Sequence, residues 1–94
     1  MQRNNFKGYT LLFSSQANKD LKNIDSSEAK KIDKKLRELI AGNENLDIKK
    51  MQGTSEAEYR LRCGDYRILF EIKREVITIL VIRVSHRREA YRDY

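Results

Sequence analysis

The order of apolar and polar residues along this chain predicts one strand, two helices and then three more strands. Residues 9–13 are rich in threonine, leucine and aromatic side chains, which favours a strand. Apolar residues then recur every three or four positions over 17–24 and over 29–40, the spacing of amphipathic helices. Ser14 and Ser15 offer an N-cap to the first helix, and Gly42 is a natural stop for the second. The two segments predict a helical hairpin with one apolar face.

The start and the polar face of the second helix are also visible in the sequence. Asp25 and Glu28 stand three positions apart, as the partners of a capping box do, so the helix should begin near Asp25. Lysines flank its apolar stripe, and we interpret them as a solvated face. A contact with nucleic acid is the alternative, because phosphate contacts need no sequence information. These lysines are Lys30, Lys31, Lys34 and Lys35.

The second half of the chain predicts a loop over residues 43–57 and strands over 58–63, 66–73 and 76–85. Gly64-Asp65 is a two-residue hairpin signal, and a turn of that length fixes the register of the first two strands. The expected facing pairs are Cys63 with Tyr66, Arg62 with Arg67, Leu61 with Ile68, and Arg60 with Leu69.

Alternation along this hairpin predicts one apolar face and one face of arginines. Leu61, Ile68, Phe70 and Ile72 fall on the first face, whereas Arg60, Arg62 and Arg67 fall on the second. Like charges opposite each other across a ladder destabilise a sheet, so this cluster invites an anionic partner. The alternative is an ordinary surface network in which Glu58, Glu71 or Glu75 neutralises the arginines.

The last strand and the polar segment after it complete the predicted fold. Residues 76–84 are apolar at nearly every position, which is typical of a central strand covered on both faces. Residues 73–75 allow more than one loop length, so the register of the last two strands stays open. Residues 85–94 predict a polar tail or a short helix. We therefore expect a single α+β domain over residues 1–94, of order β-α-α-β-β-β(-α), with the helical hairpin packed on a mainly antiparallel four-stranded sheet.

The net charge of the chain indicates what kind of partner it binds. The net charge is +6 and the pI is about 9.6, which indicates nucleic acid, an anionic membrane or an acidic protein as the partner. A positive excess that only keeps a small protein soluble is the alternative. Eight of the ten arginines lie at or after Arg60, whereas nine of the ten lysines lie at or before Lys50. Because arginine offers a planar fork matched to phosphate oxygens, the second half of the chain is the expected phosphate-binding part.

Several other classes of protein are disfavoured. A single cysteine excludes an internal disulfide and fits the reducing cytoplasm, and one histidine with one cysteine predicts no metal cluster. The longest apolar run, 76–82, is too short to span a bilayer, and the N-terminus shows no export signal. We interpret Cys63 as a small core residue rather than a nucleophile.

Three stretches carry a family resemblance: 59–62 (YRLR), 64–72 (GDYRILFEI) and 81–91 (VIRVSHRREAY). Together with the β-α-α start and the Lys50-Met51-Gln52-Gly53 segment, they resemble the RelE/ParE superfamily of toxins from type II toxin–antitoxin systems, and its RelE branch in particular. The resemblance implies a sheet that curves around the helical hairpin. It also implies a toxin that enters the ribosomal A site and cleaves mRNA there, with a cognate antitoxin as its second partner.

The implied reaction is attack of a ribose 2′-hydroxyl on the adjacent phosphate, which leaves a 2′,3′-cyclic phosphate and needs neither a metal nor a cofactor. DNA lacks that nucleophile, so the substrate is RNA. By resemblance, Arg67 and Arg87 bind the phosphate, Arg87 also helps to protonate the leaving oxygen, and Tyr91 stacks on a base. The implied RNA-binding set is Arg60, Arg62, Arg67, Arg87, Arg88 and Lys50.

The chain departs from the family at the proton acceptor. Arg60 and Arg62 stand where the RelE branch carries lysines, and an arginine with a pKa of about 12.5 or above is a poor base. His86 has a suitable intrinsic pKa, but neighbouring strand residues face opposite ways, so His86 and Arg87 cannot both face the substrate. We interpret His86 first as structural and second as a proton acceptor. Tyr91 has an alternative as well, as an aromatic that docks the tail onto the core.

Two other functions remain compatible with the sequence. ParE-like relatives share the fold and inhibit DNA gyrase, although the His-Arg-Arg-Glu-Ala-Tyr ending favours the RelE branch. An inactive relative that only binds its antitoxin is the other alternative. Codon preference, the stoichiometry of any antitoxin complex and activity without ribosomes cannot be inferred from the sequence.

Overall fold

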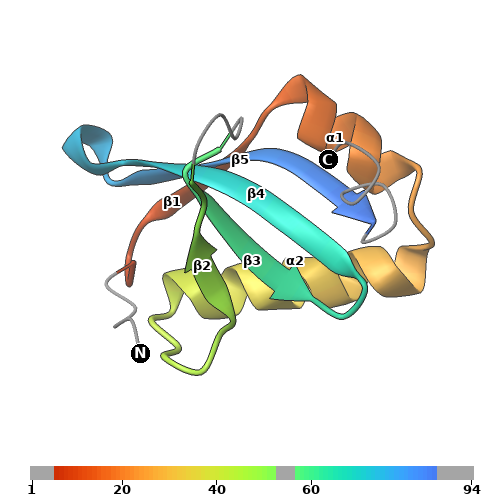
Figure 1. The fold of residues 1–94 in the computed structure, drawn as a ribbon, viewed down its shortest axis with the longest axis horizontal. Coiled ribbons are helices and arrows are strands. Elements are labelled where there is room, and N and C mark those ends of the chain that lie inside the picture. The colour runs from red at the N-terminus through yellow and green to blue at the C-terminus, as the bar shows by residue number, and fades with distance from the viewer. Residues whose placement is uncertain (1–5, 53–56, 87–94) are drawn as a thin grey trace.

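The computed structural model describes residues 6–52 and 57–86 of the chain. Its elements alternate as the hydrophobic pattern predicts, with one addition (Figure 1). In chain order they are β1 (Thr10–Phe13), α1 (Ser15–Lys22), α2 (Ser26–Ile40), β2 (Ile48–Lys50), β3 (Tyr59–Cys63), β4 (Tyr66–Lys73), a 3-10 turn (Arg74–Val76) and β5 (Thr78–His86).

The strands form one mixed sheet in the order β1-β5-β4-β3-β2. β1 runs parallel to β5, and the other neighbours are antiparallel. The α+β class and the single helical hairpin are confirmed, whereas the prediction of four strands is wrong by one. β5 is an interior strand between β1 and β4, but the central strand of the sheet is β4, so the prediction of β5 as the central strand is wrong. The extra strand, β2, lies in the segment 43–57, for which the sequence predicts a loop. Three residues with one apolar side chain show no alternation, so only pairing with β3 makes β2 a strand.

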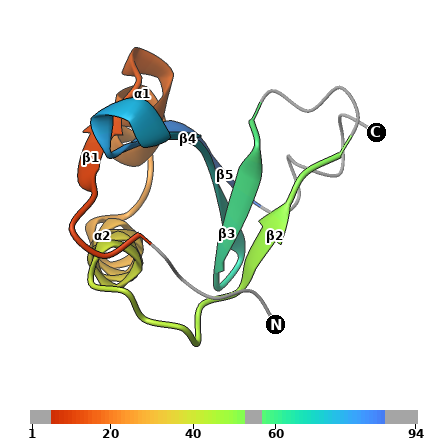
Figure 2. The same cartoon turned by 90° about the vertical axis from the view of Figure 1, so that its left-hand side faces the viewer.

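Both helices pack on the same face of the sheet, as Figure 2 shows with the helices on its left side and β2 and β3 on its right. The buried stripe of α2 consists of Ile32, Leu36 and Leu39. It joins the core formed by Leu61 and Phe70, together with other side chains from β3, β4 and β5. The predicted apolar face of the hairpin is thus confirmed, and the arginines of the hairpin lie on the other face of the sheet.

The hairpin β3–β4 has the predicted register at every facing pair, including Arg62 with Arg67. Gly64 in the turn has a φ of 58°, a conformation that glycine adopts without steric cost. The β4–β5 register, which the sequence left open, pairs Lys73 with Thr78 across a four-residue loop. β5 therefore begins at Thr78, two residues later than predicted, because Arg74–Val76 form a 3-10 turn.

Side chains of α1 and its cap cover the part of β5 that extends beyond β1. Ser14 Oγ accepts a hydrogen bond from Ala17 N at 3.0 Å, so Ser14 is the N-cap of the two serines that the sequence offered. The same hydroxyl donates to Ile82 O at 2.6 Å, and Asp20 Oδ2 accepts from Val84 N at 2.9 Å. Polar groups of the β5 backbone that no strand pairs are thereby satisfied, and the exit of β5 is held against α1.

The ends of α2 agree only in part with the prediction. Asp25 is the N-cap residue by position but its side chain makes no capping hydrogen bond, so the predicted capping box does not form. At the other end Gly42 has a φ of +85°, and its N–H donates to Leu39 O at 3.3 Å, as expected after a helix. None of the helices in the described ranges is long and apolar enough to cross a membrane.

Candidate nucleic-acid interface

Cross-strand register places the charged residues in rows on the sheet face opposite the helices. The first row runs from Arg62 on β3 to Arg67 on β4 and Ser85 on β5. The second row runs across four strands and contains Lys49, Arg60, Leu69 and Arg83. Facing partners of a ladder point to the same side, so these rows form one surface, which we call the arginine face. It brings together three residues predicted for the site: Arg60, Arg62 and Arg67.

The arginines of this face differ in how far they are engaged. Arg60 Nη2 lies 3.5 Å from Asp47 Oδ1, and only 12% of the Arg60 side chain is exposed. Asp47 is itself 56% exposed, so solvent screens this contact. Arg62 is exposed, and Arg67 opposite it is half-buried. Two guanidinium groups therefore face each other across neighbouring strands, which favours an anion between or above them.

Two of the three acidic residues considered as neutralising partners of the arginines pair with other groups, and the third lies in the β4–β5 loop. Glu71 Oε2 pairs with Lys73 Nζ at 2.9 Å, and Glu58 Oε1 accepts a hydrogen bond from Ile72 N at 3.2 Å. Glu75 lies in the 3-10 turn, beyond the end of β4. Asp47, which sequence reasoning did not consider, pairs with Arg60.

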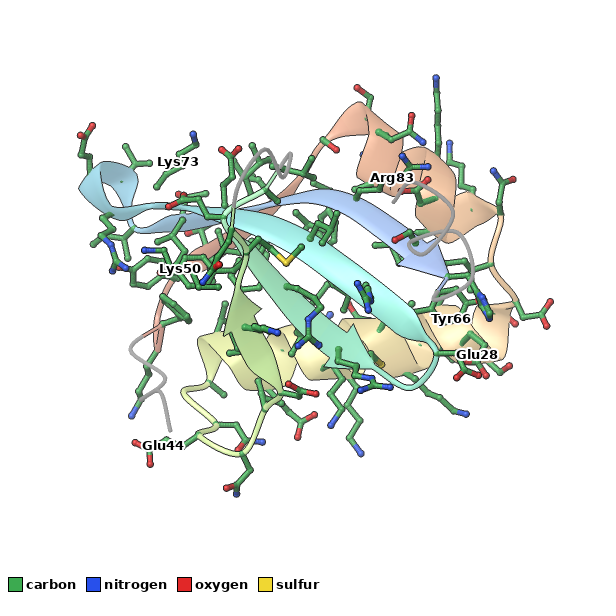
Figure 3. The ribbon with its side chains drawn as sticks, viewed as in Figure 1. Glu28, Glu44, Lys50, Tyr66, Lys73 and Arg83 are labelled. Carbon is green, nitrogen blue, oxygen red and sulfur yellow. The ribbon has the colours of Figure 1, made fainter. Side chains whose placement is uncertain are left out.

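His86 and Lys50 lie apart from the arginine face. His86 faces Tyr66, and their rings meet edge to face with centroids 5.2 Å apart. Tyr66 and His86 lie two residues away from the facing pair Ile68 and Val84, which is buried in the core, so all four side chains point to the core side of the sheet. This position supports the structural interpretation of His86. Lys50 faces Tyr59 on the same side of the ladder, whereas its neighbour Lys49 is the lysine of the arginine face. Figure 3 labels Lys50 near the β2 end of the sheet, well away from Tyr66.

Arg87, Arg88 and Tyr91 lie outside the described residues. Their predicted convergence with Arg67 on a single RNA linkage therefore stays a prediction. The last described residue, His86, ends the strand that carries Ser85 and Arg83 into the arginine face.

Neither a metal centre nor a reactive thiol is indicated in the described ranges. No group of three or more His, Cys, Asp or Glu side chains there could hold a metal ion. Cys63 is buried in the core, and burial raises the pKa of its thiol. A thiol that stays protonated at neutral pH is a poor nucleophile, so Cys63 is a core residue as expected.

Sequence reasoning missed Lys49 and Arg83 as members of this surface. Lys49 sits in a strand where the sequence predicts a loop, so its side of the sheet could not be assigned. Arg83 faces Leu69 only because of an irregularity in the β4–β5 ladder at Leu69/Phe70. A register known across the whole sheet was the signal that would have found them.

The described residues thus form a small α+β domain with a helical hairpin on one sheet face and paired arginines on the other, an architecture shared with small toxins of toxin–antitoxin systems. Residues 11–91 match the family model of the ParE toxin of the type II toxin–antitoxin system parDE. The chain therefore belongs to the RelE/ParE superfamily of type II toxins, and its relatives place it in the RelE-like branch.

Relatives with known names or structures support the branch. The chain is 38% identical over 88 residues to toxin RelE3 of Methanocaldococcus jannaschii, covering 89% of this chain and 96% of that protein. It is similar to the toxin in the RelB–RelE antitoxin–toxin complex from Methanococcus jannaschii, with 34% identity, a TM-score of 0.68 and coverage of 88% and 98%. The isolated Escherichia coli RelE toxin shares 25% identity with a TM-score of 0.67, covering 90% and 93%.

Proposed function

We propose that this protein inhibits translation as a ribosome-dependent, metal-independent endoribonuclease that cleaves mRNA in the A site. The observation that carries the proposal is the gathering of Arg60, Arg62 and Arg67 on one sheet face, opposite the helices and next to the exit of β5. Membership of the RelE-like branch supports the same activity.

The proposed step is an internal transfer of the phosphodiester. The 2′-oxygen forms a bond to phosphorus, and the bond from phosphorus to the 5′-oxygen breaks. The 2′-hydroxyl gives up its proton and the leaving 5′-oxygen takes one up. The products are a 2′,3′-cyclic phosphate and a 5′-hydroxyl, so neither a metal nor an added water is needed for the balance.

The chain's arginines would supply charge stabilisation in this step. Arg67 is flanked on one side by Arg62 and on the other by Ser85, so a phosphate above it meets two guanidinium groups. Preorganised charge stabilisation is commonly the largest catalytic contribution, and acid–base help adds roughly 10²- to 10⁴-fold. His86 points to the core side of the sheet and not to the arginine face, so it is poorly placed to accept the proton. We therefore propose a slow enzyme that relies on the ribosome to complete the proton transfer.

An alanine series tests the proposal on translating ribosomes. Removal of Arg67 or Arg87 should lower the rate of mRNA cleavage by about 10²- to 10³-fold, because each would contact the transition-state phosphate. Tyr91→Ala should reduce cleavage as well, through loss of base stacking. The rate is measured from the accumulation of 2′,3′-cyclic phosphate ends.

Arg37→Ala is the matched control, because Arg37 is an exposed arginine on α2, on the helix side of the sheet. It should cleave at the wild-type rate. If the Arg67→Ala and Arg87→Ala proteins are both folded and both cleave mRNA at the wild-type rate, the proposed nuclease mechanism is refuted.

We further propose that a cognate antitoxin covers the arginine face and thereby blocks RNA. The support is the charge of this face and the presence of RelB beside the toxin in the solved relative from Methanococcus jannaschii. Carboxylates of such a partner would pair with Arg62 and Arg67 and compete with phosphate for the same guanidinium groups.

Inhibition of DNA gyrase is the second candidate, because the matching family model describes ParE. Gyrase supercoiling assays with the purified protein distinguish the two. A RelE-like nuclease leaves supercoiling unchanged and cuts ribosome-bound mRNA, whereas a gyrase inhibitor blocks supercoiling and leaves ribosome-bound mRNA intact.

A further inference from the structure

We propose that Arg83 and Leu69 form a second RNA contact, which holds the nucleotide next to the one that is cut. This inference rests on the proposed function and extends it to residues outside the predicted site. Both residues belong to the second row of the arginine face, one row away from Arg62 and Arg67.

The register of the sheet puts Arg83 in the same row as the predicted Arg60. It faces Leu69 on β4, and Leu69 faces Arg60 on β3, so the apolar side chain stands between two guanidinium groups. Leu69 is half-buried rather than part of the closed core. An apolar side chain flanked by cations suits a single-stranded nucleotide, whose base packs on the apolar surface while its phosphates meet the charges.

Arg83 is only loosely held by the protein itself. Its Nε lies 3.9 Å from Asp20 Oδ2, and this buried nitrogen has no hydrogen-bond partner among the described residues. Both Asp20 oxygens are already engaged, Oδ2 by Val84 N and Oδ1 by Gln16 Nε2, each at 2.9 Å. The Arg83 side chain is 37% exposed. The exposed part of the side chain can therefore meet a ligand, although Arg83 lies beside α1 (Figure 3) with its Nε near Asp20.

The spacing of the two rows matches consecutive nucleotides. Neighbouring rows on one face are two residues apart along each strand, about 7 Å, and neighbouring strands are about 4.8 Å apart. Arg60 and Arg83 thus stand about 10 Å apart across β4. An RNA strand that places one phosphate at Arg62 and Arg67 can set the next nucleotide over Leu69, with a phosphate at Arg83.

Binding of a short, fluorescently labelled single-stranded RNA with 2′-O-methyl riboses tests this contact without cleavage. Anisotropy is measured over a range of salt concentrations. Arg83→Gln should weaken binding by about tenfold at low salt and reduce the slope of log affinity against log salt by about 0.7, the value for one phosphate on a single strand. Arg83→Lys keeps the charge and should keep the wild-type slope.

The remaining variants separate the contact from a general loss of charge. Arg37→Gln removes one charge on the helix side and should leave the slope of log affinity against log salt unchanged. Leu69→Ala should weaken binding without changing that slope, because it removes an apolar surface and no charge. A wild-type slope in Arg83→Gln, with wild-type RNA binding and cleavage intact, overturns this inference alone. If the wild-type protein neither binds nor cleaves RNA, the proposed function falls and this inference with it.

Discussion

At the scale of single residues, Ile77 stands out, because among the described residues it is the non-glycine residue with a positive φ. Its φ of 48° and ψ of 53° are left-handed, a region that β-branched residues avoid. The fold keeps it there because Ile77 O accepts from Thr10 N at 2.9 Å, which ties the β4–β5 loop to β1. The side chain is 53% exposed, so its burial contributes little in return.

Ile77→Asn should therefore stabilise the protein. Asparagine tolerates the left-handed region, and a left-handed residue with a Cβ costs about 1–2 kcal/mol, so we expect a gain of about 1 kcal/mol in the free energy of unfolding. The midpoint of thermal unfolding should rise by about 4–8 °C. The control is Val76→Asn, since Val76 is 66% exposed and has no positive φ. Equal shifts of the unfolding midpoint in the two variants would show that relief of backbone strain at Ile77 does not cause the stabilisation.

At the scale of elements, the β3–β4 hairpin places two like charges opposite each other. A neutral strand former at Arg62 should relieve the repulsion with Arg67. We expect Arg62→Thr to raise the free energy of unfolding by about 0.5 kcal/mol at low ionic strength, with the gain shrinking as salt screens the pair.

Denaturant unfolding at two salt concentrations measures this effect, and Arg74→Thr serves as the control because Arg74 lies in the 3-10 turn outside the ladder. If Arg62→Thr destabilises the hairpin at both salt concentrations, the two guanidinium groups do not repel each other in the free protein. A stabilised variant that cleaves mRNA more slowly would show that the repulsion is retained for function.

At the scale of the whole molecule, the sheet separates two surfaces with different tasks. One face buries the apolar stripes of α1 and α2, and the other carries the arginine rows. The affinity of the proposed antitoxin should therefore fall as ionic strength rises, because guanidinium–carboxylate pairs of this kind are screened. Binding titrations of the toxin with its antitoxin over a range of salt concentrations measure how the affinity depends on ionic strength. The double variant Arg60→Gln, Arg62→Gln should show a shallower dependence, and an affinity that ignores salt would contradict the proposed mode of binding.

The sequence by itself determined the features that depend on near neighbours in the chain. Helical spacing determined α1 and α2, and the pair Ser14-Ser15 determined where α1 is capped. The two-residue turn at Gly64 determined the whole β3–β4 register, including the Arg62–Arg67 pair. These depend on local geometry and on short hydrogen-bonded loops, which a few residues are enough to specify. The arginine and tyrosine motifs of the second half were sufficient to identify the superfamily.

Only the tertiary structure decided the features that depend on distant partners. β2 forms because Ile48 and its neighbours pair with β3 at Leu61. The ion pair of Arg60 with Asp47 and the position of Arg83 on the arginine face, which the irregular β4–β5 ladder produces, are two further examples. Each of these pairs joins residues whose separation along the chain no local pattern encodes. Pairing across a sheet is chosen by the burial and register of all strands together, so the surface that we assign to RNA became complete only when the chain was folded.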